Sequence, residues 1–314
     1  MKTTLCQLGE RGLIALLKRQ LPRGRGVRVG IGDDCAAVQI GRGAGGRLLL
    51  LKTDAVVEGV HFDKRATPFQ IGWKAMARPL SDIAAMAGRP RWALITAGLR
   101  GEMPVRFVRE VYRGLAAAAG KFGVAIVGGE TVRTPDRFWL SVALAGEVEP
   151  SAMRLRSGAR VGDAIFVTDA LGGSIAGKHL KFTPRLAEAQ WLAKQGCVGA
   201  MIDISDGLAH DLGHICRESG VSACLWKSAI PIAPAAGGSL QRALHDGEDF
   251  ELLFTVPSAR AAKLKHAWRK KFPRLRLSLI GFVLCGKGIR LIDDAGRWQH
   301  LDEDGYDHFQ PRHA

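Results

Sequence analysis

Acidic residues in this chain recur in one setting, directly after short apolar runs and beside glycine, serine or threonine. The stretch VGIGDDCAAV (29–38) holds two adjacent aspartates among small and apolar residues. Burying an unpaired carboxylate is costly, and neighbouring carboxylates repel each other. Any fold of this chain must therefore bring a compensating charge to these positions.

Strand-like apolar runs alternate with helical ones, which predicts α/β or α+β layers. Thr67 is an expected N-cap, and Pro79 is expected to kink or divide the helix that follows it. The expected strands are 47–54, 91–99, 124–130, 137–148, 164–168, 200–203, 221–226, 249–256 and late strands within 275–293. The expected helices are an amphipathic one at 1–20, then 67–88, 104–123, helices around 172–195, 208–219 and a basic helix after 256.

The length of 314 residues predicts about two domains. The tract EPSAMRLRSGARVGD (149–163) is a plausible junction, so we expect domains at 1–148 and 149–314. No apolar run approaches the roughly 18 residues that span a membrane, and the start does not resemble a signal peptide. Six cysteines without a C-x-x-C pair favour reduced thiols in a cytoplasmic protein over disulfides or zinc.

The net charge of +15 favours polyanions or phosphorylated small molecules as partners. The most basic stretch, KLKHAWRKKFPRLRL (263–277), allows two interpretations. It is either a nucleic-acid surface with interleaved aromatic residues or, as we favour, a solvated helix face followed by a strand.

Two glycine-rich stretches imitate nucleotide-binding motifs. GRGAGG (41–46) precedes a strand rather than a helix, which favours a hairpin connection over a dinucleotide fingerprint. GGSIAGK (172–178) fits a P-loop, but His179 stands where a P-loop has Ser or Thr to hold magnesium. We favour a glycine-led helix start there.

The acidic residues are expected to converge on one cleft, because ligands gather at the carboxyl ends of strands. Several carboxylates without His or Cys favour Mg²⁺ or Mn²⁺ over zinc, and Mg²⁺ commonly bridges carboxylates to phosphates. For a single aspartate the alternative is a capping role, as for Asp206 before helix 208–219. The set comprises Asp33, Asp34, Asp54, Asp82, Glu130, Asp203, Asp206, Glu248 and Asp249.

At these residues the chain resembles the thiamine-monophosphate kinase family, of the aminoimidazole-ribonucleotide synthetase and selenophosphate synthetase superfamily. The motifs, in order, are GIGDDCAAV, KTDAVVEGVHF, SDIAAMAGRP, VGGETVR, RSGARVGD, AMIDISDGLAHDLGHI, DGEDFELLFT and GYDHF. The resemblance implies two α/β domains with mixed sheets, an ATP site without a P-loop, and a homodimer joined through N-terminal sheets. The first domain would bind ATP and metal and dimerise, and the second would complete the nucleotide and substrate site.

The implied reaction moves the γ-phosphoryl group of ATP onto thiamine monophosphate, with several Mg²⁺ ions. The implied metal ligands are Asp34, Thr53, Asp54, Asp82, Glu130, Asp203 and Asp206, with Asp33 supporting them. The implied nucleotide contacts are Tyr112, Gly129, Glu130, Arg156 and Ser205. The implied substrate contacts are His61, Glu248 and Tyr306. On residues alone, His61 could equally be a satisfied buried histidine and Tyr306 a packed aromatic.

The acceptor is a phosphate oxygen that is already ionised, so direct in-line transfer needs no general base or nucleophile. Arg133 and Arg156 are candidates for countering phosphate charge, although Arg133 could be a plain surface residue. Three departures from the family pattern leave room for a shifted substrate preference or slower turnover. These are Glu130 for Asp, Pro79 for Asn, and Asp246 for Gly.

Two rival functions stay open at this level. One is another ATP-dependent synthetase or ligase of the same superfamily. The other is a basic nucleic-acid-binding protein, whose binding would weaken steeply with salt. The kinase interpretation predicts ATP and thiamine monophosphate as partners, no membrane, and no nucleic acid.

Overall fold

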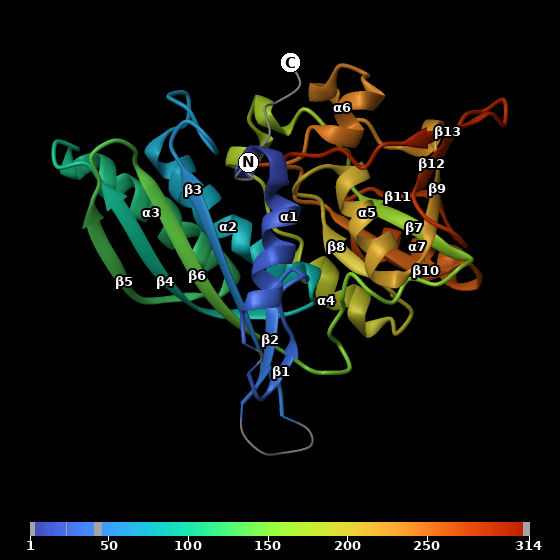
Figure 1. Ribbon diagram of the computed structural model, residues 1–314, viewed down its shortest axis with the longest axis horizontal. Helices are drawn as coiled ribbons and strands as arrows, with labels where there is room; N and C mark the ends of the chain where they lie inside the picture. Colours follow the sequence, from blue (N-terminus) through green and yellow to red (C-terminus); the bar gives the residue numbers. More distant parts are fainter. Residues whose placement is uncertain (1–3, 23, 41–45, 310–314) are drawn as a thin grey trace.

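The computed structural model describes residues 4–22, 24–40 and 46–309. They form two mixed β-sheets with helices packed against them, which confirms the predicted α and β layers (Figure 1). Residues 41–45 of the stretch GRGAGG lie outside the described residues. The strands on either side of that stretch pair antiparallel.

The first sheet has the strand order β1-β2-β3-β6-β4-β5, and within the described residues β4 and β5 alone pair parallel. Helices α2 (Pro68–Ala85) and α3 (Val105–Phe122) cover one of its faces. Its strands are β1 (Val27–Val29), β2 (Ala36–Gln39), β3 (Leu48–Val57), β4 (Arg89–Leu99), β5 (Ala125–Arg133) and β6 (Trp139–Val148).

The second sheet has the order β13-β12-β9-β11-β7-β10-β8. Helices pack on both of its faces, because alternate side chains of β7 enter two different cores, Phe166 with α7 and Ile165 with α5. Its strands are β7 (Asp163–Thr168), β8 (Met201–Asp203), β9 (Ser222–Trp226), β10 (Leu252–Pro257), β11 (Leu277–Leu284), β12 (Ile289–Ile292) and β13 (Trp298–Leu301). The helices of this half are α4 (Leu186–Lys194), α5 (Leu208–Ser219), α6 (Leu240–His245) and α7 (Ser258–Lys271).

The larger hydrophobic core is continuous between the two sheets. It runs from Leu140 of β6 through Leu80 of α2 and Leu192 of α4 to Phe254 of β10 and Trp268 of α7. Helix α2 is therefore the central element that both sheets share. Helix α1 (Leu5–Gln20) lies between the sheets in the view of Figure 1.

Several local expectations can be compared with the structure. The Thr67 hydroxyl accepts the Gln70 N–H, which confirms the predicted N-cap. Pro79 does not divide α2, which is one helix and buries this residue. Between 172 and 185 the expected helix is reduced to two short 3₁₀ turns, Ser174–Ala176 and Lys178–Leu180. Among the described residues, no helix combines the length and the apolar character needed to cross a membrane.

Candidate functional site

Three of the predicted aspartates form a buried cluster where the two sheets meet. Asp34 lies in the turn before β2, Asp82 lies on α2, and Asp203 is the last residue of β8. One carboxylate oxygen from each lies within 4.8 Å of those of the other two. The predicted convergence of distant carboxylates is therefore confirmed for this group, which we call the aspartate cluster.

Two cationic side chains partly neutralise the aspartate cluster. Arg156 Nη2 lies 2.6 Å from Asp34 Oδ1, and Lys52 Nζ lies 2.7 Å from Asp82 Oδ1. Asp203 has the neutral hydroxyl of Ser81 as its side-chain partner. Asp34 Oδ2 is buried and has no hydrogen-bond partner among the described residues. An orphaned carboxylate oxygen in an all-oxygen cluster fits a hard divalent cation such as Mg²⁺.

The pKa values show how much negative charge stays uncompensated. Burial, and then the neighbouring charge of Asp34, raise the pKa of Asp203 to about 7. The same two causes raise the pKa of Asp33 to about 7. Burial opposes the charge of Lys52, yet the carboxylates of Asp82 and Asp54 raise the pKa of that lysine above its ordinary value. A bound cation would stabilise the ionised carboxylates and so lower their pKa values. Binding of a cation to this cluster is therefore favoured at neutral pH.

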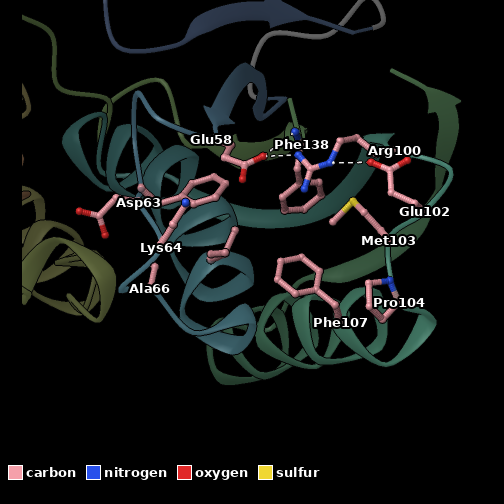
Figure 2. A pocket seen from close by; sticks show the side chains of 12 residues that line it. Glu58, Asp63, Lys64, Ala66, Arg100, Glu102, Met103, Pro104, Phe107 and Phe138 are labelled. Atoms are coloured by element: carbon pink, nitrogen blue, oxygen red, sulfur yellow. Dashed lines mark hydrogen bonds and ion pairs between the residues drawn. The ribbon is translucent and has the colours of Figure 1, made fainter. Parts of the chain in front are cut away.

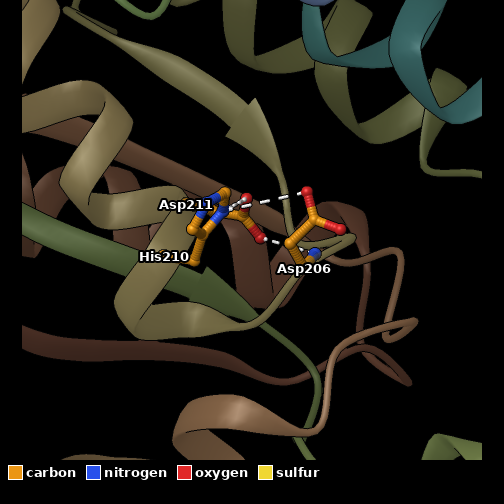
Figure 3. A group of neighbouring side chains, drawn as sticks. All are labelled: Asp206, His210 and Asp211. Atoms are coloured by element: carbon orange, nitrogen blue, oxygen red, sulfur yellow. Dashed lines mark hydrogen bonds and ion pairs between the residues drawn. The ribbon is translucent and has the colours of Figure 1, made fainter. Parts of the chain in front are cut away.

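A second acidic group stands at the start of α5 (Figure 3). His210 Nδ1 lies 3.8 Å from Asp206 Oδ2 and 3.5 Å from Asp211 Oδ1. Burial raises the pKa values of Asp206 and Asp211 to about 7. The alternative that Asp206 caps α5 is wrong, because Gly207 is the N-cap. Asp211 instead turns back and accepts the backbone N–H groups of residues 205, 206 and 207.

A third group links α2 to the loop that carries Glu248. Lys74 of α2 is fully buried, and its Nζ lies 2.7 Å from Glu248 Oε2 and 2.7 Å from His179 Nδ1. Arg78, one turn further along α2, lies 3.5 Å from Glu248 Oε1 and 3.3 Å from Asp54 Oδ1. Burial lowers the pKa of Lys74 to about 8. For Glu248, burial is outweighed by His179, Lys74 and Arg78, which lower the pKa to about 2.

The backbone near Glu248 is unusual. Glu248 has φ +54°, a left-handed conformation that costs a non-glycine residue energy. Its N–H donates to the Ser205 carbonyl at 2.7 Å, which ties this loop to the DISDG turn. The predicted residues Ser205 and Glu248 are thereby brought together.

His61 and Tyr306 both contact the ring of His308, and the His61 carbonyl accepts a hydrogen bond from Lys74 of this third group. His61 is buried, its Nδ1 accepts the Val57 N–H at 3.1 Å, and burial lowers its pKa to about 3. The His308 ring lies 5.4 Å from the His61 ring and 4.9 Å from the Tyr306 ring, measured between centroids. The Tyr306 N–H donates to the Asp206 carbonyl. The C-terminal segment thus lies over the acidic groups.

Thr53 and Glu130 are not brought into the aspartate cluster. Successive strand residues point to opposite faces, so Thr53 points away from the face that carries Lys52 and Asp54. Thr53 is exposed, and its hydroxyl lies 3.3 Å from the Ser141 hydroxyl. Glu130 is exposed on the edge strand β5, in register with Thr96, and the neighbouring Gly129 pairs with Ile95.

Tyr112 and Arg133 also lie apart from the aspartates. Tyr112 is half-buried on α3 and packs against the core of the first sheet. Arg133 is exposed at the end of β5. Among the described residues, neither belongs to the aspartate cluster or to the groups around it.

The stretch GGSIAGK does not form a phosphate cradle. Asp249 accepts the Gly172 N–H and the Ser174 hydroxyl, and Asp246 accepts the Gly173 N–H at 2.9 Å. Lys178 pairs with Glu251 at 2.9 Å. Carboxylates therefore occupy the donors that a P-loop would offer to phosphate, and Asp246, one of the departures from the family pattern, has a structural partner.

The structure also contains a pocket that the sequence did not indicate (Figure 2). It has a volume of about 320 Å³, and Phe62, Phe107 and Phe138 are among the residues that line it. The ion pair between Glu58 and Arg100 stands at its rim. None of the predicted site residues lines this pocket.

Sequence reasoning missed four charged residues that the structure places in these groups. They are Lys52, Lys74, Arg78 and Asp211. Lys52 and Asp211 lie within two of the family motifs, KTDAVVEGVHF and AMIDISDGLAHDLGHI. A signal existed for Lys52, because it shares a strand face with Asp54 two residues away. A signal existed for Lys74 and Arg78 as well, because they precede Asp82 by eight and four residues on the predicted helix and so share its face, although their partners Glu248 and Asp54 are distant in sequence.

Comparisons with known proteins point to one family. Residues 32–148 match the family model described as AIR synthase related protein, N-terminal domain. A thiamine-monophosphate kinase of Rhodopirellula baltica is 39% identical over 81% of this chain and 84% of its own length. The Aquifex aeolicus kinase of the same name is 33% identical over 95% and 99%.

Solved structures agree as well. The structure described as AaThiL complexed with AMPPCP and TMP superposes with a TM-score of 0.83 at 31% identity, covering 98% of this chain and 99% of that one. The Escherichia coli hydrogenase maturation protein HypE has a TM-score of 0.69 at 21% identity, covering 83% and 88%, and shares the fold.

Proposed function

The chain belongs to the thiamine-monophosphate kinase family and is an enzyme that phosphorylates thiamine monophosphate with ATP, and we propose that the transfer takes place beside the aspartate cluster. The observation that carries this placement is the buried set Asp34, Asp82 and Asp203 with its orphaned oxygen. Residues 1–148 would supply most of the nucleotide and metal ligands. Residues 149–314 would complete the site through Arg156, Asp203 and the Glu248 loop.

Mg²⁺ fits this site, and its proposed ligands are Asp34, Asp54, Asp82, Asp203 and Asp206, with Asp33 in support. When bound, Mg²⁺ neutralises phosphate oxygens during phosphoryl transfer. The presence of several ions stays a prediction. The cytoplasmic location also stays a prediction.

The protein's own cations have distinct tasks in this proposal. Arg156 is anchored on Asp34 and offers its remaining N–H groups to the nucleotide. Lys74 and Arg78 hold Glu248 ionised, so that its carboxylate can attract the cationic thiazolium of the substrate. Because the acceptor phosphate is already ionised, the transfer uses no general base, and none of the described residues is assigned that role.

Tyr306 and His61 would contact the substrate from the C-terminal segment and the turn after β3. His61 has a backbone partner at Nδ1, which leaves Nε2 as the atom available to the substrate. Ser205 is a proposed nucleotide contact beside the cluster, whereas Gly129 and Tyr112 lie apart from it and stay nucleotide contacts only as the family resemblance implies them.

The uncovered face of the first sheet supports a homodimer. Leu51, Trp92 and Leu94 are exposed there, although they are large and apolar. Leu51 and Trp92 lie in one row across the sheet, on either side of Ala145 of β6. A second copy packing on this face would bury these side chains. Thr53 and Glu130 share the face, so in such a dimer they would lie at the interface, where a partner's site could use them.

We expect Trp92→Arg to shift the protein from dimer to monomer in size-exclusion chromatography with light scattering, because a charge would replace buried apolar contact. Val161→Arg introduces the same charge at an exposed apolar position outside this face and should leave the mass unchanged. A Trp92→Arg variant that keeps the dimer mass would show that another surface joins the copies.

The kinase function is tested by product analysis. With ATP, Mg²⁺ and thiamine monophosphate, we expect ADP and thiamine diphosphate in equal amounts, measured by chromatography. Thiamine in place of its monophosphate should give no product, since it lacks the acceptor phosphate. ADP without thiamine diphosphate would instead indicate a synthetase. Salt-sensitive RNA binding without any turnover would favour the nucleic-acid alternative.

A further inference from the structure

Lys52 occupies a position that the proposed reaction does not explain. It lies on β3 between the exposed residues Leu51 and Thr53, and its side chain points to the opposite face, toward α2. Its Nζ lies 2.7 Å from Asp82 Oδ1, and the exposed side-chain fractions of the two residues are 24% and 10%. The ammonium group is therefore held inside the aspartate cluster rather than in solvent.

The carboxylates of the cluster differ in how they are compensated. Asp82 has Lys52 and Asp34 has Arg156, whereas the side-chain partner of Asp203 is the uncharged Ser81 hydroxyl. Three carboxylates this close could hold more than one divalent ion between them if no other cation were present. A divalent ion and an ammonium at bonding distance from the same carboxylate oxygen repel each other strongly.

The two protein cations also differ in kind. Arg156 spreads its charge over a planar group. Its Nε and Nη2 both donate to Asp34 Oδ1, so Asp34 Oδ2 is left without a partner. Lys52 presents a compact point charge, comparable to a small cation in how it binds oxygen. It is tethered to the central part of a paired strand and cannot dissociate.

We propose that Lys52 acts as a permanent cation of the aspartate cluster. Its ammonium group occupies one cation position at Asp82. The cluster therefore binds one divalent ion fewer than its carboxylates would hold without Lys52. Asp34, through its buried and unpartnered Oδ2, and Asp203 would hold the remaining divalent ion. This inference rests on the proposed metal site, but it concerns how many ions bind and not which substrate is phosphorylated.

The test is a count of bound Mn²⁺ per chain, by electron paramagnetic resonance of free Mn²⁺ in an equilibrium titration without nucleotide. We expect Lys52→Met, which keeps the side-chain length but removes the charge, to bind one more Mn²⁺ per chain than the wild type. Lys52→Arg keeps the charge and should show the wild-type count. Lys194→Met removes an exposed lysine of α4 and should also show the wild-type count.

An unchanged or smaller count in Lys52→Met would overturn the proposal. If that variant does not fold in EDTA, its thermal unfolding is followed with added Mn²⁺ and, separately, with NaCl of equal ionic strength. Recovery of a cooperative transition with Mn²⁺ alone supports the proposal, since a divalent ion then replaces the lost charge. No recovery with Mn²⁺ overturns it. The kinase assay is run separately, so a failure of the assigned reaction leaves the ion count interpretable.

Discussion

Asp203→Asn is expected to lower the turnover of thiamine monophosphate at least about 1,000-fold, which corresponds to roughly 4 kcal/mol of transition-state stabilisation. The amide has nearly the size of the carboxylate and can still accept the Ser81 hydroxyl. What is lost is the one negative charge in the aspartate cluster that has no cationic partner. Steady-state kinetics with saturating ATP and Mg²⁺ measure the effect.

A matched control separates this effect from general loss of charge. Asp302→Asn removes a carboxylate whose side chain is 81% exposed, and it should keep wild-type turnover. The Asp203→Asn protein should unfold at or above the wild-type temperature in EDTA, because burial of its carboxylate is unfavourable. Wild-type turnover in a folded Asp203→Asn protein would refute the placement of the reaction at this cluster.

Gly114→Ala is expected to destabilise the fold by about 3 kcal/mol, at the upper end of overpacking effects. A Cβ at Gly114 of α3 would lie 2.0 Å from the Phe69 carbonyl oxygen, and one at Gly72 of α2 would lie 1.9 Å from the Val111 carbonyl oxygen. These two glycines let α2 and α3 approach each other closely. Since α2 also carries Lys74, Arg78 and Asp82, the displacement would disturb the site.

The control for this prediction lies on the same helix. A Cβ at Gly120 would meet nothing within 4 Å beyond the backbone of its own helix, and Gly120→Ala should stabilise the protein by about 0.5–1 kcal/mol through helix propensity. Urea unfolding of both variants measures the difference. Equal stability of Gly114→Ala and the wild type would mean that the two helices can separate without cost.

Periodicity and capping were sufficient to predict most of the elements. The alternation of apolar runs located β3 to β6 of the first sheet and most strands of the second, and Thr67 located the start of α2, because these signals depend on neighbours in sequence. Pro79 was expected to kink or divide the helix, but α2 is one helix from Pro68 to Ala85. Residues around it are buried between the two sheets, and tertiary packing of that kind outweighs one lost helical hydrogen bond. Strands β1, β2 and β13 were missed, since each has only three or four residues and too few of them for an apolar alternation to show.

The order of residues was enough to show that carboxylates follow the apolar runs, that they need a cation, and which family the chain resembles. It could not show which of them meet in the folded chain: Asp34, Asp82 and Asp203 do, whereas Thr53 and Glu130 lie on the other face of the first sheet. Nor could it show which residues supply the opposing charge, Lys52 and Arg156 at the cluster and Lys74 at Glu248. These contacts depend on packing. The pattern of apolar residues can be read from neighbours in sequence, whereas the energy of a buried charge depends on its neighbours in space.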